Sequence, residues 1–316
     1  MSALSDPPAL GRDDVIRARD ALEGRLHRTP VFSSHALGEG MYLKAELFQK
    51  TGSFKPRGVL NKLATLSPEE KQRGVITISA GNHAQAVAWA AGVQGVDALI
   101  VTWATASPQK VAATRAYGAT VDMESPDPTQ AFDRLAELQA ASGRTLVHPF
   151  NDPVVQAGAG TVALEIEEDV PRVDTIVVPV GGGGLISGIA AAANCRVVAV
   201  EPELSPALHE GLKAGHSVPV QPRSIADGLS APFAGETAIA LCAARGVESV
   251  LVSEADIAEA MRFLYERAKL ACEPAGAAAV AAVRTGKVTG TVVCCVVSGG
   301  NVAPETAVAV LSNPAG

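Results

Sequence analysis

Short runs of β-branched and aliphatic residues alternate along the chain with longer, alanine-rich segments of helical period. The short runs are uniformly apolar, which is typical of strands that are covered on both faces of a sheet. They predict strands over 75–79, 97–102, 119–123, 145–150, 174–180, 196–201, 248–253 and 291–298. The alanine-rich segments predict helices over 57–66, 82–92, 108–117, 129–142, 154–168, 184–193, 235–245, 254–271 and 276–285. This order predicts an α/β fold with open, mostly parallel twisted sheets flanked by helices.

Composition and charge narrow the possible function classes. The chain has 316 residues and a formal net charge of −7. Nucleic-acid-binding proteins usually carry a basic face, so we expect no nucleic-acid partner. The uncharged stretch 175–195 contains Pro179 and four consecutive glycines, which indicates strand, loop and helix rather than a membrane span. Residues 1–14 do not resemble a secretory signal and the five cysteines lack metal-binding spacing, so we expect reduced thiols and a cytoplasmic location.

Four consecutive glycines, Gly181–Gly184, follow a predicted buried strand and precede an apolar helix. Without Cβ atoms, their backbone N–H groups can point into one small cavity, where the helix N-terminus adds partial positive charge. The segment lacks the GK[ST] of a nucleotide-binding P-loop, and Ile186 stands where a dinucleotide fingerprint requires glycine. We interpret it as a cradle for a small phosphate monoester, with a tight turn that binds no ligand as the alternative.

A lysine stands at the start of another predicted helix. In TGSFKPRG (51–58), Pro56 fits the first helical turn, which places Lys55 at a helix N-terminus. An ammonium group there opposes the helix dipole, which favours a lysine that loses its charge and acts as an amine nucleophile. An isolated lysine would be interpreted as a surface charge. Beside a phosphate cradle, Lys55 instead predicts a Schiff base with pyridoxal phosphate.

Two further turns follow predicted strands. In SAGNH (79–83), the backbone N–H groups and the Ser79 and Asn82 side chains can hold a carboxylate, while a buried structural role suits His83 equally well. SGGN (298–301) offers one hydroxyl near the sheet centre, or a simple glycine turn. Ligands of open α/β sheets bind beyond the carboxyl ends of the strands, so these turns predict one shared site.

Together these segments resemble the fold-type-II pyridoxal-phosphate enzymes, and within them the serine/threonine dehydratases (threonine ammonia-lyases) and serine racemases. The resemblance spans residues 25–303 and rests on KAELFQKTGSFKPRG (44–58), SAGNHAQ (79–85), HPFNDP (148–153), VPVGGGG (178–184), EP (201–202), ADG (226–228), EPAG (273–276) and SGGN (298–301). It implies a tryptophan-synthase-β-like fold with a small mobile domain, 41–147, and a large cofactor-binding domain made of 1–40 and 148–316. It also implies a homodimer or another homo-oligomer. Twelve of the 30 glycines lie in these motifs or beside them, which we interpret as backbone that approaches a cofactor.

The resemblance assigns roles to residues of this chain. Lys55 would be the catalytic residue and would form the Schiff base. The cofactor would be held by Phe54, Lys55, Asn82, Gly181, Gly182, Gly183, Gly184, Glu273 and Ser298. The substrate would be bound by Ser79, Ala80, Asn82, His83 and Asp227. The family's divalent-cation site uses Glu201 and an acid six residues later, where this chain has Ala207, so the use of a divalent or a monovalent cation stays open.

The implied activity is the conversion of L-threonine or L-serine to 2-oxobutyrate or pyruvate and ammonia. Lys55 would remove the Cα proton, and a hydroxyl such as Ser298 facing the pyridine nitrogen would favour prompt loss of hydroxide. The alternatives are a dehydratase of another 3-hydroxy amino acid, such as 3-hydroxyaspartate or phenylserine, and a serine racemase. A non-catalytic binding protein and a cysteine-synthase-like enzyme fit the segments less well. Because fifteen residues follow Asn301, we expect no feedback control by a C-terminal regulatory domain.

One departure from the racemases gives a testable prediction. Serine racemases carry a second base, a serine, at the position of Ala80, and an alanine methyl cannot supply the opposite-face proton. We expect Ala80→Ser to raise D-serine formation from L-serine by at least about tenfold, since a positioned proton donor contributes roughly 10²–10⁴ in rate. Chiral chromatography of the products measures it, with Ala80→Val as the control without a hydroxyl. Appreciable D-serine formed by the unaltered chain would contradict the argument.

Overall fold

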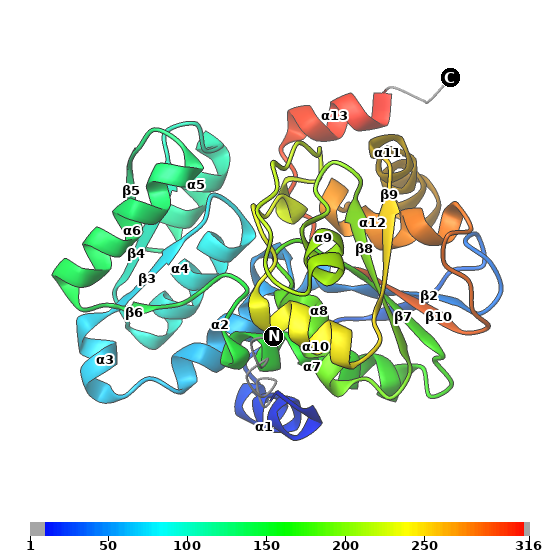
Figure 1. Ribbon diagram of the computed structural model, residues 1–316, viewed down its shortest axis with the longest axis horizontal. Coiled ribbons are helices and arrows are strands. Elements are labelled where there is room, and N and C mark those ends of the chain that lie inside the picture. Colours follow the sequence, from blue (N-terminus) through cyan, green and yellow to red (C-terminus); the bar gives the residue numbers. More distant parts are fainter. Residues whose placement is uncertain (1–9, 313–316) are drawn as a thin grey trace.

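The computed structural model describes residues 10–312 and contains two sheets (Figure 1). The larger has six strands in the order β1-β2-β10-β7-β8-β9, which are parallel except for β1 with β2. The smaller has four parallel strands in the order β5-β4-β3-β6. In chain order the strands are β1 (Val31–Ser33), β2 (Met41–Ala45), β3 (Val75–Ile78), β4 (Ala98–Trp103), β5 (Thr120–Ser125), β6 (Thr145–Leu146), β7 (Thr175–Pro179), β8 (Arg196–Pro202), β9 (Glu248–Val252) and β10 (Val293–Val297). The predicted α/β fold class is confirmed.

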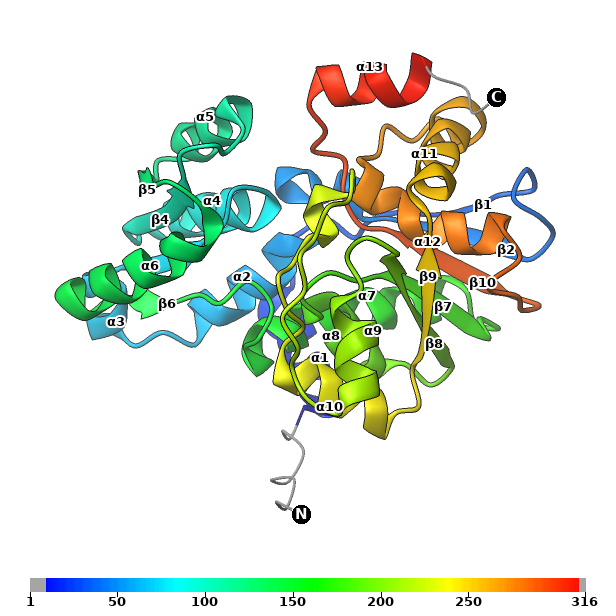
Figure 2. The same cartoon turned by 45° about the horizontal axis from the view of Figure 1, so that its top comes forward.

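Helices cover both faces of the larger sheet and pack against the smaller one (Figures 1 and 2). The α-helices are α1 (Arg12–Leu22), α2 (Lys55–Ala64), α3 (Pro68–Arg73), α4 (Asn82–Gln94), α5 (Pro108–Ala116), α6 (Pro128–Ser142), α7 (Pro153–Asp169), α8 (Gly184–Ala192), α9 (Ala207–Ala214), α10 (Glu236–Ala244), α11 (Glu254–Phe263), α12 (Pro274–Arg284) and α13 (Pro304–Ser312). Short helical turns are η1 (Glu46–Phe48), η2 (Lys50–Gly52), η3 (Asp227–Leu229) and the π-helical η4 (Leu264–Ala268).

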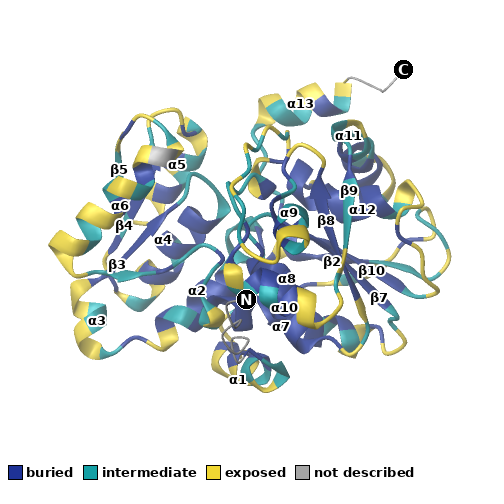
Figure 3. Ribbon diagram, in the orientation of Figure 1, coloured by how far each residue is buried: buried dark blue, intermediate teal, exposed yellow. Residues whose placement is uncertain are grey.

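The central strands are buried on both faces, as their uniformly apolar sequences predict (Figure 3). Along β7, Ile176 and Val178 join the core that α1, α7, α8 and α10 form on one face. The intervening Val177 joins the core on the opposite face, with α11 and α12. This alternation follows from the two-residue period of a strand. In the smaller sheet, α2 and α4 contribute to one core and α6 to the other.

The structure differs from the predicted elements in three places. The expected strand 145–150 is paired as β6 only over Thr145–Leu146, since the chain then turns through Pro149, which has no N–H to donate. The expected helix 254–271 ends as an α-helix at Phe263, and after η4 Lys269 takes a φ of 60°. That reversal buries Leu270, whose N–H donates to the Leu264 carbonyl at 2.9 Å. Elements absent from the predicted set are α1, β1, β2, α3, α9 and α13.

The division into domains stays a prediction. The structure adds that β2 pairs with β10 and so belongs to the larger sheet. Sheet membership therefore leads us to propose that the small domain begins after Ala45 rather than at residue 41. Residues 1–9, part of the segment expected not to be a secretory signal, lie outside the described residues. None of the helices within residues 10–312 has the length and apolarity needed to cross a membrane.

A buried cluster of four charged side chains joins α2 to its neighbours. The Arg57 guanidinium donates to both carboxylate oxygens of Glu46 at 2.8 Å, and to those of Glu165 at 2.7 and 2.9 Å. Lys44 donates to Glu165 at 2.5 Å and to the Thr29 carbonyl at 2.8 Å. Arg57, Glu46 and Lys44 are at most 2% exposed. The cluster ties α2 to η1, β2 and α7, and its two positive and two negative charges balance.

We predict that Arg57→Met lowers the free energy of unfolding by about 3–5 kcal/mol, because it removes the guanidinium that both carboxylates of the cluster share. Urea unfolding measures the change. The control is Arg196→Met, since the exposed Arg196–Glu248 pair should contribute about 1 kcal/mol or less. Equal losses in the two variants would contradict a special role for the buried cluster.

Candidate active site

Lys55 is the first residue of α2, and Phe54 is the N-cap of that helix. The Lys55 ammonium donates to the Pro149 carbonyl at 3.0 Å and lies 5.1 Å from the centroid of the Phe54 ring. Burial lowers the pKa of Lys55 to about 8, against the opposing effect of the Glu273 carboxylate. Lys55 is therefore far more readily deprotonated near neutral pH than an ordinary lysine, as a nucleophile or base requires.

The loop before Lys55 is held by the segment after β10. Thr51 takes a φ of 60°, which is unusual for a β-branched residue. The Asn301 side chain donates to the Thr51 carbonyl at 2.7 Å, and the Phe54 N–H donates to the Ser298 carbonyl at 3.1 Å. Ser298 thus lies beside the Lys55 segment through its backbone carbonyl, and the expected role of its hydroxyl stays a prediction. The role of Asn301 was not predicted; its place in SGGN was the available signal.

A hydrogen-bonded pair, partly buried Asn82 and buried Glu273, joins the helix after β3 to the segment before α12. The Asn82 side chain, at the start of α4, donates to Glu273 Oε1 at 2.6 Å and accepts from Asn301 at 2.9 Å. Glu273 Oε2 is buried without a hydrogen-bond partner. A methyl group added at Gly299 would lie 2.3 Å from Glu273 Oε1, so this glycine makes room for the carboxyl group. Burial raises the pKa of Glu273 to about 7, with the Asp227 carboxylate as the next cause.

The four glycines lie between β7 and α8, with Gly184 as the first helical residue. Within residues 10–312, none of their backbone N–H groups has a hydrogen-bond acceptor in the protein. They are therefore available donors at a helix N-terminus, which is suited to an anion. Packing also requires glycine here, since a methyl group at Gly182 would lie 2.3 Å from the Phe150 ring and one at Gly183 2.4 Å from the Ala238 Cβ.

The residues expected around a substrate carboxylate differ in their burial and in their partners. Ser79 and Ala80 are partly buried in the loop between β3 and α4, where the Ser79 hydroxyl accepts from the Gly81 N–H at 3.1 Å. The His83 ring is buried against the Val147 carbonyl, 3.0 Å from Nε2, and its pKa is lowered to about 3, first by burial. This placement favours the structural interpretation of that imidazole. Asp227 lies in η3 and pairs with Lys110 of α5.

Glu201 has protein partners that the sequence did not predict. Its two carboxylate oxygens accept from the backbone N–H groups of Leu208 and His209, each at 2.7 Å, at the start of α9. Burial raises the pKa of Glu201 to about 8. Residues 10–312 contain no group of three or more His, Cys, Asp or Glu side chains that could hold a metal ion. The cation site at Glu201 stays a prediction without a second ligand.

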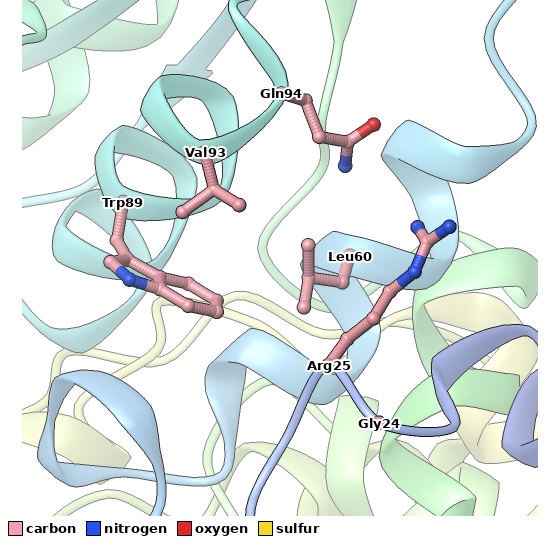
Figure 4. Close-up of a pocket in the computed structure, with 6 residues that line it drawn as sticks. All are labelled: Gly24, Arg25, Leu60, Trp89, Val93 and Gln94. Atoms are coloured by element: carbon pink, nitrogen blue, oxygen red, sulfur yellow. The ribbon is translucent and has the colours of Figure 1, made fainter.

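A separate surface pocket of about 540 Å³ lies between α4 and the turn after α1 (Figure 4). Trp89, Val93 and Gln94 of α4 line it, facing Arg25 and Leu60. None of the predicted site residues is among the residues that line it. The candidate active site is therefore defined by converging polar groups rather than by this pocket.

Comparison with known proteins identifies the family. The family described as pyridoxal-phosphate dependent enzyme matches residues 22–299. The chain belongs to this family. It is 43% identical over 301 residues to the L-threonine ammonia-lyase of Thermotoga maritima, covering 92% of this chain and 75% of the relative. It is 40% identical over 305 residues to a catabolic L-threonine dehydratase of Staphylococcus aureus, covering 92% and 88%.

Solved structures agree with this assignment. Maize serine racemase superposes with a TM-score of 0.90 at 35% identity, covering 95% of this chain and 96% of the racemase. A threonine deaminase from T.th. superposes with a TM-score of 0.87 at 38% identity, covering 93% and 99%. The expected fold-type-II architecture and the dependence on pyridoxal phosphate are thereby confirmed.

The residues present fit pyridoxal phosphate. Its phosphate is an anion that requires several donors, and Gly181–Gly184 offer unpaired N–H groups at a helix N-terminus. Its aldehyde requires an amine that loses its proton readily, and the lowered pKa of Lys55, about 8, gives a larger deprotonated fraction near neutral pH than an ordinary lysine has. The unpartnered Glu273 Oε2 and Ser53 hydroxyl show that buried polar groups at this site await a partner.

The electrostatics around Lys55 favour neutral groups over charged ones. Burial lowers the pKa of Lys55 and of His83, and raises that of Glu273. His148 is also kept neutral, because burial lowers its pKa to about 4 and its Nδ1 accepts from the backbone N–H groups of Phe150 and Asn151. The fixed positive potential comes instead from the N-termini of α4 and α8. Such a site attracts anionic groups while its amine stays available for chemistry.

The pKa of Lys55 gives a testable prediction. In cofactor-free protein, the rate at which Lys55 combines with pyridoxal phosphate should rise with pH and reach half its maximum near the Lys55 pKa of about 8. Glu273→Gln should move this midpoint to lower pH, because the Glu273 carboxylate raises the Lys55 pKa. Stopped-flow absorbance measures the rate. A midpoint at the usual lysine pKa of about 10.4, or a rise after Glu273→Gln, would contradict the assignment.

Proposed function

We propose that this protein is a pyridoxal-phosphate-dependent dehydratase of L-threonine, L-serine or both. The products are 2-oxobutyrate or pyruvate, and ammonia. The substrate loses its Cα proton and its β-hydroxyl as water, and hydrolysis of the resulting enamine returns one water and releases ammonia. The relatives described above carry the names of threonine ammonia-lyases and dehydratases, which supports this choice of substrate.

One observation carries the proposal: Lys55, whose amine has a lowered pKa of about 8 and binds the Pro149 carbonyl, is combined with four unpaired glycine N–H groups at the start of α8. Phe150 connects these two groups in space, since it follows Pro149, which accepts from Lys55, and its ring covers Gly182. The arrangement suits a ligand with an aldehyde at one end and a phosphate at the other. A protein that bound only phosphate would have no use for the amine.

Named residues can hold the cofactor and the substrate. We propose that Gly181–Gly184 bind the phosphate and that Asn82, Glu273 and Ser298 surround the ring. The N-terminus of α4, with Ser79 and Ala80 before it, suits the substrate carboxylate, because free N–H groups there favour an anion. Pyridoxal phosphate, when bound, supplies an electron sink for the negative charge that develops at the substrate Cα.

The chain itself supplies the proton transfers. The Lys55 amine accepts the Cα proton, and its lowered pKa of about 8 suits this task near neutral pH. The Pro149 carbonyl accepts a hydrogen bond from Lys55 and so fixes the direction of the amine. Glu273, with a pKa of about 7, can hold a proton at Oε1 or Oε2 beside Asn82. Glu273 is buried, and Lys55 is partly buried.

The finer expectations on assembly and location stay predictions. A homodimer or another homo-oligomer would be detected by sedimentation velocity. A cytoplasmic location is supported by five free cysteines, four of which are buried. No partner other than a small amino-acid substrate is required by the proposal.

The proposal is tested by product analysis with the holoenzyme. We expect 2-oxo acid and ammonia in equal amounts from L-threonine or L-serine, and no turnover of D-serine at comparable rates. Lys55→Ala should lower kcat by at least about 10²–10⁴, because it removes the proton acceptor. The control is Lys71→Ala in α3, which we expect to retain full activity.

The same panel separates the alternatives. Turnover of threo-3-hydroxyaspartate or phenylserine in place of L-threonine and L-serine would assign another dehydratase. Racemised serine without ammonia would assign a racemase. Repeating the assays with and without magnesium and potassium decides the cation requirement.

A further inference from the structure

Helix α7 contacts two functional helices through glycines that lie two residues apart. A methyl group added at Gly158 would lie 2.3 Å from the Arg57 carbonyl oxygen of α2. One added at Gly160 would lie 2.5 Å from the Gly188 carbonyl oxygen of α8. Both distances are shorter than any normal contact, and both neighbours are backbone. Because successive α-helical residues are rotated by about 100°, residues two apart face nearly opposite sides, so α7 lies between α2 and α8.

Each close contact with α7 lies about one helical turn after a predicted site residue, which is Lys55 on α2 and Gly184 on α8. On α2, the close contact is at Gly58, three residues after Lys55, and a methyl group there would lie 2.5 Å from the Val155 carbonyl oxygen. On α8, it is at Gly188, four residues after Gly184, and a methyl group there would lie 2.1 Å from the Gln156 carbonyl oxygen. The position of α7 therefore determines where the start of α2 lies relative to the start of α8.

Polar contacts fix α7 along its length. At the α2 side, Glu165 of α7 binds the Arg57 guanidinium, and Asn61 of α2 donates to the Val154 carbonyl at 2.8 Å. Lys62 of α2 pairs at 2.8 Å with Asp152, the N-cap of α7. These contacts prevent α2 from sliding along α7. Figures 1 and 2 show the three helices side by side at the centre of the molecule.

We propose that α7 is a fixed spacer between Lys55 and the glycine cradle, and that Gly158 and Gly160 are positioning residues for pyridoxal phosphate. This inference rests on the proposed roles of Lys55 and Gly181–Gly184. The two ends of the cofactor are joined by a rigid ring, so they bind together only if the two sites have the right separation. A correct separation links the two binding events and multiplies their affinities, typically by about 10²–10⁴. A methyl group at either crossing pushes the helices apart and removes part of that linkage.

The experiment compares three ligands on the full chain, isolated as the holoenzyme and freed of cofactor with hydroxylamine. Pyridoxal phosphate uses both ends, pyridoxine phosphate lacks the aldehyde, and pyridoxal lacks the phosphate. In Gly160→Ala and in Gly158→Ala, we expect the affinity for pyridoxal phosphate to fall at least about tenfold. The affinities for the other two ligands should change less than about threefold, because each end remains intact. Equal losses for all three ligands would overturn the spacer role.

Two controls separate spacing from stability. Ile166→Ala creates a cavity six residues beyond Gly160 in α7 and should lower the thermal midpoint, while it adds no atom at either crossing. Gly92→Ala makes the same chemical change in α4, outside the spacer. Both should retain the wild-type ratio of affinities for pyridoxal phosphate and pyridoxine phosphate. If either control loses that ratio as fully as Gly160→Ala, the spacer role is wrong.

The fixed separation can also be tested on the unaltered protein, so that this test does not depend on whether a variant folds. A cofactor homologue with one extra methylene between ring and phosphate should bind at least about tenfold more weakly than pyridoxal phosphate, because the separation is fixed. Equal affinity would overturn the inference. If pyridoxal does not react at Lys55, or if pyridoxine phosphate binds a Gly183→Val variant unchanged, the proposed site itself is wrong. Those two outcomes are distinct from a failure of the spacer.

Discussion

The balanced charge cluster around Arg57 is the constraint on which the candidate site depends. Arg57 lies two residues after Lys55, so the two side chains leave α2 in nearly opposite directions, one toward the cluster and one toward the site. Removing two carboxylates from water is costly, and only the complete set of hydrogen bonds offsets that cost. The cluster therefore tolerates one orientation of α2. Since Lys55 is the first residue of α2, the cluster also fixes the position of Lys55, although it lies on the opposite side of the helix from the site.

The alternation of strands and helices could be predicted because every central strand is buried on both faces. Ile176, Val177 and Val178 show this directly, since successive residues enter opposite cores. The strand β1 could not be predicted in the same way, because its three residues are partly or fully exposed and it is held by pairing with β2. The strained φ of Thr51 also has no local signal, since it depends on Asn301. Strands with a uniformly apolar local pattern were predicted, whereas β1 and the conformation of Thr51, which depend on distant partners, were not.

The glycines of the predicted site have two different structural roles, and only the structure separates them. Their surplus was interpreted as backbone that approaches a cofactor, and the unpaired N–H groups of Gly181–Gly184 are consistent with that. Gly58 and Gly188, however, face the backbone of α7. A sequence pattern does not separate these two uses, because both require the absence of a Cβ. Glycines at the helix crossings set distances and glycines at the helix start provide donors, so the site requires both kinds at once.

The surroundings of Lys55 are formed by segments from widely separated parts of the chain. The carbonyl that accepts from its amine is that of Pro149, and the loop before it is bound by Ser298 and Asn301. Asn301 also binds Asn82, which reaches Glu273. No single motif therefore forms the site by itself, and these side-chain amides are satisfied only when the other segments are in place. Leaving the Asn82 or the Asn301 amide unpaired would cost free energy. The smaller sheet, the larger sheet and the loop after β10 are therefore expected to adopt their positions cooperatively.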